Sequence, residues 1–387
     1  MARRGDIKKC FTSGNSCRYG HIDLVGPATF ESEHKAPIPC LDLENITKRF
    51  VIACSCDGVV GIYDTHTSRE AVSLDALSLV AKLTKESPGQ HSQAVYSVCW
   101  YPVDTGIFVT GSRDKTVKVW DANSLEAVIS FDVDGCVLGT AMSPIASSHC
   151  LIAVTGSMDH ISLCDVSSGG STHKLMGHRG EVWSCAWSHT SEWELISGGH
   201  DGQVCLWDVR RPGALDYFDM YNTEIQFDKF GNHGAKGDSM PASHRIAHGG
   251  QVVSCYADPS GLYWITSGND GQIKLWNTKT KTHVIKHFGK KVGRTKLPRG
   301  ISTAADGKAL FHPSGNSIHV FDLYSGSVLT SLTSGHYGQV HCCVWNEMNE
   351  ELYSAGADKS LLVWAPKFED GGNGHLDGDE WSDDNYY

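Results

Sequence analysis

A spacing rule that repeats along the chain most constrains its fold. A histidine lies 23 residues before an aspartate, and that aspartate lies six before an aromatic residue, at His34/Asp57/Tyr63, His91/Asp114/Trp120 and His178/Asp201/Trp207. With spacings of 22 and six, the rule also holds at His248/Asp270/Trp276 and His336/Asp358/Trp364. Four residues before the aspartate stands a hydroxyl residue, namely Thr110, Ser197, Thr266 or Ser354, but Ala53 in the first unit. Such a period indicates stacked copies of one supersecondary unit.

The unit itself consists of short strands. In the copy from 177 to 211, the runs Val182–Ser188, Glu194–Gly198 and Val204–Trp207 are rich in residues that favour strands. Asp201-Gly202 is a hairpin signal, because glycine readily adopts the positive φ that tight turns require. Three short strands cannot bury both faces alone, so each unit needs neighbours. The sequence therefore predicts an all-β protein.

The repeated histidine, hydroxyl, aspartate and aromatic residue resemble the WD-repeat pattern. This resemblance implies a β-propeller, in which each blade has four antiparallel strands. It also implies a structural hydrogen-bond network inside each blade. Three such networks would consist of His91, Thr110, Asp114 and Trp120; of His178, Ser197, Asp201 and Trp207; and of His336, Ser354, Asp358 and Trp364. Two further units are degenerate and end at Cys164-Asp165 and Phe321-Asp322, so seven blades are predicted.

The repeats divide the chain into three parts. A single closed propeller is expected over 34–366, between an N-terminal arm at 1–33 and a disordered acidic tail at 367–387. The last repeat lacks an outer strand of its own, so the apolar alternation near 21–25 predicts a segment that closes the ring. A long loop is expected at 212–247, and its aromatics should dock either on the propeller or on a partner: Tyr217, Phe218, Tyr221, Phe227 and Phe230.

Charge and hydropathy limit the possible partners. The chain has a net charge of −11, and its last 19 residues contain seven acids and no lysine or arginine. The tail would therefore repel nucleic acid. The basic loop 290–299, with Lys290, Lys291, Arg294, Lys296 and Arg299, is interpreted as solvated, and a phosphate backbone is the alternative. No apolar run of membrane length and no signal peptide are evident, so we expect a soluble intracellular protein.

Cysteine and histidine patterns give no sign of a metal or a catalytic centre. Cys185, Cys255 and Cys343 each follow a repeat histidine by seven residues, as expected for small apolar residues packed one to a blade. Among the 14 cysteines, Cys54 and Cys56 are interpreted as the one close pair, and reduced thiols are expected. Known catalytic motifs are absent. We predict a binding protein that is not an enzyme and needs no metal or cofactor.

One blade ends in a motif with a more specific resemblance. Trp207-Asp208-Val209-Arg210 is similar to the WD-x-R ending of the WD-repeat substrate receptors of cullin-4–RING ubiquitin ligases. In that family the arginine lies on the narrow face that meets the adaptor, the large subunit of the damaged-DNA-binding complex. The resemblance implies that Arg210, with Asp208 and Arg211, contacts this adaptor.

Longer runs resemble the Cockayne syndrome A family of these receptors. They are 96–121, 175–211 and 334–366, together with the degenerate ending Leu163-Cys164-Asp165 and the tail sequence Trp381-Ser382-Asp383. The resemblance implies a nuclear receptor in transcription-coupled nucleotide excision repair, whose partners are the Cockayne syndrome B ATPase and the stalled RNA polymerase II complex. Direct specific nucleic-acid binding and membrane association are not expected.

One departure from the family leaves an alternative open. The family docks partly through an N-terminal helix-loop-helix, but glycines and Pro27 interrupt any helix in 1–33. A WD-repeat scaffold without a ligase connection, which reads histone tails or assembles a signalling complex, is therefore the second hypothesis.

Overall fold

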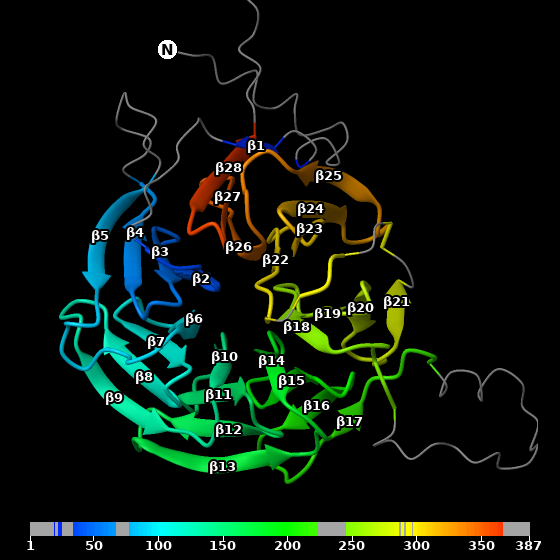
Figure 1. The fold of residues 1–387 in the computed structure, drawn as a ribbon. Helices are drawn as coiled ribbons and strands as arrows, with labels where there is room; N and C mark the ends of the chain where they lie inside the picture. Colours follow the sequence, from blue (N-terminus) through cyan, green and yellow to red (C-terminus); the bar gives the residue numbers. More distant parts are fainter. Residues whose placement is uncertain are drawn as a thin grey trace, which may run out of the picture.

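The strands of the chain form a ring around a central axis (Figure 1). The computed structural model describes residues 19, 22–24, 34–66, 77–222, 245–285, 288–289, 292–295 and 297–366. Within these ranges there are 28 β-strands and no helix, and hence no helix that could span a membrane. The prediction of an all-β WD-repeat propeller is confirmed.

Each blade is an antiparallel sheet of four strands, which we label a to d from the channel outwards. The first blades contain β2 (Cys40–Leu43), β3 (Phe50–Cys54), β4 (Val60–Asp64), β5 (Ser78–Leu83); β6 (Val95–Trp100), β7 (Ile107–Ser112), β8 (Thr116–Asp121), β9 (Ala127–Asp132); and β10 (Val137–Met142), β11 (Leu151–Gly156), β12 (His160–Asp165), β13 (Gly170–Met176).

The remaining blades follow the same order around the ring. They contain β14 (Val182–Trp187), β15 (Glu194–Gly199), β16 (Val204–Asp208), β17 (Asp216–Tyr217); β18 (Val252–Ala257), β19 (Tyr263–Gly268), β20 (Ile273–Asn277), β21 (His283–Ile285); β22 (Ser302–Thr303), β23 (Ala309–Ser314), β24 (Ser317–Asp322), β25 (Val328–Leu332); and β26 (Val340–Asn346), β27 (Glu351–Gly356), β28 (Leu361–Pro366), β1 (Ile22–Leu24). Blades three and four share one bridging pair, Gly156 with Val182.

The N-terminal strand β1 completes the last blade. It pairs antiparallel with β28, with Ile22 opposite Pro366 and Leu24 opposite Trp364. This strand lies within the segment near 21–25 for which the sequence predicts ring closure. Tyr19 is also buried, and its ring meets that of Trp345 edge to face at 5.8 Å. The first and last parts of the described chain thus cover each other's open edges.

Part of the expected loop at 212–247 belongs to the propeller. Tyr217 lies in β17 and pairs with Cys205, which makes this segment the outer strand of blade four. Phe218 is fully buried, and its ring packs against Trp276 of the next blade at 5.1 Å. The expected loop is therefore shorter at its start, where β17 lies, and Phe218 docks on the propeller, which is one of the two alternatives that the sequence leaves open. Phe227 and Phe230, the tail 367–387, and Lys290, Lys291 and Lys296 lie outside the described residues.

Apolar clusters between neighbouring blades form the core. Between blades four and five, Ile196, Val252 and Trp276 are fully buried in one cluster. The packing leaves no room for a side chain at Gly198, where an added Cβ would come within 2.4 Å of Val252 Cγ1. Close packing of this kind fixes each blade against the next.

Alternating strand directions give the ring two distinct faces. Strands a and c of a blade run in one direction, and b and d in the other, because each sheet is antiparallel. All a–b and c–d loops therefore reach one face, which we call the a–b face. The b–c and d–a loops reach the opposite face, which we call the d–a face.

Candidate functional site in the faces and channel of the propeller

Blade four shows the network that its sequence pattern implies. Trp207 Nε1 donates a hydrogen bond to Ser197 Oγ at 2.8 Å, and Ser197 Oγ lies 2.7 Å from His178 Nε2. His178 Nδ1 lies 3.0 Å from a carboxylate oxygen of Asp201, which also accepts the backbone N–H of Arg179. One tautomer of His178 satisfies every donor of the network. In it, Nδ1–H donates to the Asp201 carboxylate, and Nε2 accepts a hydrogen bond from the Ser197 hydroxyl. The network thus joins a strand, a turn and the loop from the preceding blade.

Three other blades carry the same arrangement. The hydroxyl oxygen lies 2.7–2.8 Å from both the tryptophan and the imidazole nitrogen in the sets His91, Thr110, Asp114, Trp120; His248, Thr266, Asp270, Trp276; and His336, Ser354, Asp358, Trp364. The aspartate oxygen is 2.8–3.2 Å from Nδ1 of each histidine. The structure therefore brings together every residue that the repeat pattern assigns to these networks, and their role is structural.

The tryptophans of these networks are also core residues. Trp120 Nε1 donates to Thr110 Oγ1 at 2.7 Å, but the Trp120 side chain is fully buried, and its ring stacks on that of Phe108 with centroids 6.1 Å apart. Trp120 thus belongs to the apolar cluster between blades one and two, and Trp207 and Trp364 are buried in other such clusters. Trp120 therefore serves both the predicted network, through Nε1, and the apolar core, through its ring. Its burial also removes it from any surface that a partner could reach.

Blades three and six replace the network in different ways. In blade three, Asp159 stands at the repeat position, but its side chain is 62% exposed and bonds only to His160 among the described residues. In blade six, Phe321 occupies the tryptophan position and His312 the hydroxyl position, and both are fully buried. His312 Nε2 lies 2.8 Å from Ser267 Oγ of blade five instead of joining a network within its own blade. A propeller blade can therefore form with an apolar substitute for the tryptophan.

The protonation states of the networks suit a structural role. Burial lowers the pKa of His91 and His248, so both imidazoles are neutral near pH 7. Burial alone would raise the pKa of Asp201, but hydrogen bonds from His178 and from backbone N–H groups outweigh it and hold the pKa below its usual value. A neutral imidazole that donates to a carboxylate satisfies both groups.

The residues implied as adaptor contacts lie together on the a–b face. Arg210, in the c–d loop of blade four, donates from Nε and Nη2 to the two carboxylate oxygens of Asp208 at 3.0 and 2.8 Å. Its guanidinium carbon lies 5.1 Å from the ring centroid of Trp193, in the a–b loop of the same blade. Arg211 is exposed beside it. Asp208 and Trp193 hold Arg210 in one orientation, and Trp193 was not predicted from the sequence.

Large apolar side chains are exposed in several loops of this same face. We call this set the apolar rim; each member is at least 43% exposed, and they are Ile46, Val103, Ile145, Leu262, Met348 and Tyr324. The first five lie in a–b loops of five different blades, and Tyr324 lies in the c–d loop of blade six. Repeated exposure of large apolar residues on one face is typical of a protein-binding surface.

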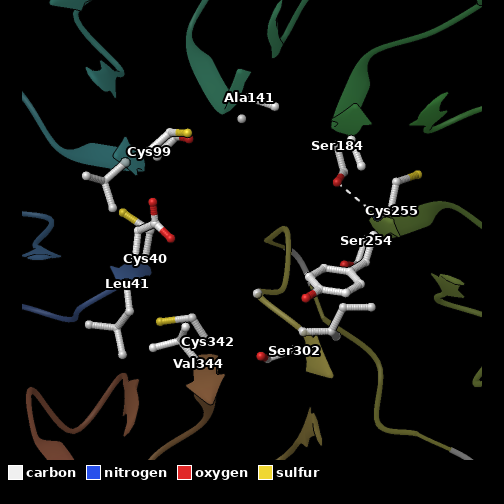
Figure 2. Close-up of a pocket in the computed structure, with 18 of the residues that line it drawn as sticks. Cys40, Leu41, Cys99, Ala141, Ser184, Ser254, Cys255, Ser302, Cys342 and Val344 are labelled. Atoms are coloured by element: carbon white, nitrogen blue, oxygen red, sulfur yellow. Dashed lines mark hydrogen bonds between the residues drawn. The ribbon is translucent and has the colours of Figure 1, made fainter. Parts of the chain in front are cut away.

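The inner strands of the blades enclose a channel of about 590 Å³ (Figure 2). Cys40, Cys99 and Cys342 lie on one side of it, and Ser184, Ser254 and Cys255 on the other. Burial raises the pKa of the Asp42 carboxyl to about 6, although this group accepts backbone N–H groups of Trp100 at 2.6 Å and Leu43 at 3.0 Å. The channel wall is thus mostly apolar, with few charged groups.

The cysteines of the inner strands are buried or half-buried thiols. Cys185, Cys255 and Cys343 line the channel wall, one from each of three blades, and burial raises the pKa of Cys185 to about 12. The prediction that Cys54 and Cys56 are the one close pair of cysteines is wrong, because Cys54 lies opposite Cys40 on the neighbouring strand. In the described ranges the cysteines are unbridged, and no group of three His, Cys, Asp or Glu side chains is placed to hold a metal.

Fold and network together define a WD-repeat β-propeller, and comparison with known proteins agrees. The family model "WD domain, G-beta repeat" matches residues 82–121, 169–208, 241–277 and 326–365. Each matched segment contains one of the four complete networks.

Several curated proteins are similar over most or half of the chain. "WD repeat-containing protein ATCSA-1" of Arabidopsis thaliana is 30% identical over 89% of this chain and 89% of its own length. "WD repeat-containing protein 1" of Gallus gallus is 22% identical, over 86% of this chain and 61% of its own length. "Radiation-sensitive protein 28" of Saccharomyces cerevisiae is 26% identical over 51% of this chain and 40% of its own length. The chain belongs to the WD-repeat protein family.

Proposed function

We propose that this protein is a non-catalytic substrate receptor of a cullin-4–RING ubiquitin ligase, and that it acts in transcription-coupled nucleotide excision repair in the nucleus. The observation that carries the proposal is Arg210, fixed by Asp208 and Trp193 on the face that also bears the apolar rim. Support comes from the similarity to a relative named ATCSA-1, over 89% of both chains, since its name contains the abbreviation of the Cockayne syndrome A family.

The a–b face has the composition of a protein interface. Arginine, tryptophan and methionine are enriched in such interfaces, and Arg210, Trp193 and Met348 all lie on this face. Arg210 is fixed by two hydrogen bonds and a ring contact, yet 56% of its side chain is exposed. Because the orientation of Arg210 is set before binding, its contact with a partner carboxylate would cost little side-chain conformational entropy. We infer that the large subunit of the damaged-DNA-binding complex docks here.

In this proposal the a–b face is the docking surface. The family's helix-loop-helix would fall in 1–33, of which the structure describes Tyr19 and Ile22–Leu24. Those described residues close the ring through β1 and through the buried Tyr19 ring, and adaptor binding is assigned to the a–b face.

The proposed mechanism is proximity. Adaptor binding on the a–b face would leave the d–a face open for the Cockayne syndrome B ATPase and the stalled RNA polymerase II complex. Holding a target near the ligase raises its effective concentration, and this requires no catalytic side chain in the receptor. The four buried His–Asp pairs already satisfy each other, so they are not expected to take part in chemistry.

Adaptor binding tests the proposal directly. The full-length chain and an Arg210→Asp variant are compared for affinity to the purified adaptor, with thermal unfolding as the control for folding. Arg179→Asp is the matched control, since Arg179 is exposed in the d–a loop of the same blade on the opposite face. We expect Arg210→Asp to weaken binding about tenfold or more, because a carboxylate replaces the fixed cation, while Arg179→Asp leaves it unchanged.

The same experiment separates the two hypotheses. If neither the native chain nor any variant binds the adaptor, the ligase proposal fails and the WD-repeat scaffold without a ligase connection replaces it. Binding of the Cockayne syndrome B ATPase is measured in parallel. Arg210→Asp should leave that interaction intact, because it is assigned to the opposite face.

A further inference from the structure

One arginine in the channel wall departs from the repeat. Arg299 precedes β22 and is only 4% exposed. The register defines its repeat position: Leu310 pairs with Phe321 as Trp264 pairs with Trp276, and Ser302 pairs with Phe311 as Tyr256 pairs with Ile265, so Arg299 corresponds to Val253. The equivalent residues of blades four, five and seven are also buried but carry no fixed charge, namely Trp183, Val253 and His341. The fold therefore does not itself require a cation at this position.

Most of the donors of Arg299 lack an acceptor. Nη1 donates to the carbonyl oxygen of Pro313 at 2.6 Å. Nε and Nη2 are buried and have no hydrogen-bond partner in the described part of the chain. Nη2 lies beside Gly293, since a Cβ built on that glycine would be 3.9 Å from it. A guanidinium carries five N–H groups, so at least three of them remain unsatisfied by the described residues.

The surroundings of Arg299 are basic rather than acidic. His312 and His341 are buried, and Nδ1 of each has no hydrogen-bond partner among the described residues. Burial lowers the pKa of both histidines, and the charge of Arg299 lowers them further. The negative charge of Asp358 raises the pKa of His341, but the Asp358 carboxylate is hydrogen-bonded to His336 and not to Arg299. Burial lowers the pKa of Arg299 to about 10, so it is charged at neutral pH.

A buried cation without a counter-charge costs several kcal/mol, and the cost falls when an anion pairs with it. Planar oxyanions match the guanidinium fork with two parallel hydrogen bonds. We propose that the channel wall around Arg299, His312 and His341 is a binding site for an oxyanion group, either a carboxylate or a phosphate. This site is separate from the a–b face. The proposal of an oxyanion site therefore does not depend on the ligase proposal.

The site lies next to the channel. Arg299 is one of the residues that line the channel, and its neighbour Gly300 is exposed. Gly300 is held between blades, because its N–H donates to the His341 carbonyl and its own carbonyl accepts from Cys343 N–H. An anion bound to Arg299 would therefore lie next to the junction of blades six and seven.

Thermal unfolding of the full-length chain tests this site. Inorganic phosphate and acetate are titrated separately at constant ionic strength, with chloride as the reference salt. We expect the melting midpoint to rise saturably with at least one of the two probes, because an anion that binds only the folded state stabilises it. A response to phosphate alone identifies a phosphate site, and a response to acetate a carboxylate site.

Substitutions at Arg299 show whether the anion-dependent rise of the melting midpoint requires this residue. Arg299→Val introduces the residue that blade five has at this position, Val253, and should abolish the saturable rise. Arg299→Lys keeps the charge but loses the fork, so half-saturation should need about tenfold more probe; this variant serves if Arg299→Val does not fold. Arg294→Ala, an exposed arginine in the same loop, should respond as the native chain does. An unsaturable native response, or an equal response of Arg299→Val, would overturn the proposal.

Discussion

Blades four and six have the same four-strand topology but are stabilised by different side chains. Blade four joins His178, Ser197, Asp201 and Trp207 in a buried polar network. Blade six has His312 and Phe321 at the serine and tryptophan positions, and Arg299 at the position that Val253 holds in blade five. This difference shows that apolar packing between blades determines the fold. The polar network adds stability where it is present, and departures from it indicate places with another role.

Truncating the apolar substitute in blade six should have the largest effect. Phe321 is fully buried, and its ring meets Phe288 edge to face at 5.5 Å. We expect Phe321→Ala to lower the free energy of unfolding by about 3–5 kcal/mol, through lost burial and a residual cavity. Chemical denaturation measures the loss, and Tyr324→Ala, an exposed aromatic of the same blade, is the control. A loss below about 1 kcal/mol would show that blade six does not rely on this packing.

Removing one network residue from blade four should have an intermediate effect. Asp201→Ala leaves the imidazole of His178 and the backbone N–H of Arg179 without their acceptor. We expect a loss of about 1–3 kcal/mol. Asp159→Ala is the matched variant in blade three, where the exposed carboxylate bonds to His160 alone among the described residues, and it should stay within about 0.5 kcal/mol. If both variants lost the same free energy of unfolding, the buried network would not be a source of stability.

Acidification should produce a smaller and graded effect. His91 and His248 have a lowered pKa in the folded chain, so between that value and about 6.5 the unfolded chain binds more protons. Their contribution to stability is therefore complete above about pH 6.5 and is lost as the pH falls. Denaturation midpoints measured at several pH values test this, and a midpoint that rises steadily on acidification would contradict it.

The channel carboxylate Asp42 should act in the opposite direction. Its folded pKa is raised to about 6, so between its ordinary value of 3.8 and that pH the folded chain holds the extra proton. Its contribution therefore grows as the pH falls through this window and partly offsets the loss from the histidines. Asp42→Asn should make the acid-induced loss of stability steeper, and an unchanged slope would show that Asp42 titrates normally.

Most of the architecture could be predicted from the sequence, because the repeat spacing fixes both strand positions and network partners. His178 and Asp201 are 23 residues apart in the chain, yet they form one hydrogen bond in the blade. Ring closure near 21–25 could likewise be expected, since the last repeat ends at Trp364 without an outer strand. The stacking of Trp120 on Phe108 could not, because the repeat pattern marks network positions and not their apolar neighbours. In a regular repeat, the spacing of two residues along the chain therefore predicts whether they are in contact in the blade.

The candidate sites were harder to predict, because their contacts join loops with no fixed spacing. Trp193 lies under Arg210 only because the a–b and c–d loops of blade four pack together. Cys40 pairs with Cys54 through a register that thiol spacing alone does not reveal. Arg299 stood out as one cation in a basic loop, whereas its burial depends on how that loop enters the channel wall.

The most direct test of the account is to compare the two faces within one blade. Met348 is 70% exposed in the a–b loop of blade seven, and Tyr337 is 92% exposed in the preceding d–a loop on the opposite face. The affinity of the cullin-4 adaptor is measured for the native full-length chain, Met348→Asp and Tyr337→Asp. We predict that Met348→Asp weakens binding, because a charge enters the apolar rim, while Tyr337→Asp binds as the native chain does. Loss of binding in Tyr337→Asp but not in Met348→Asp would contradict the assignment of the docking face.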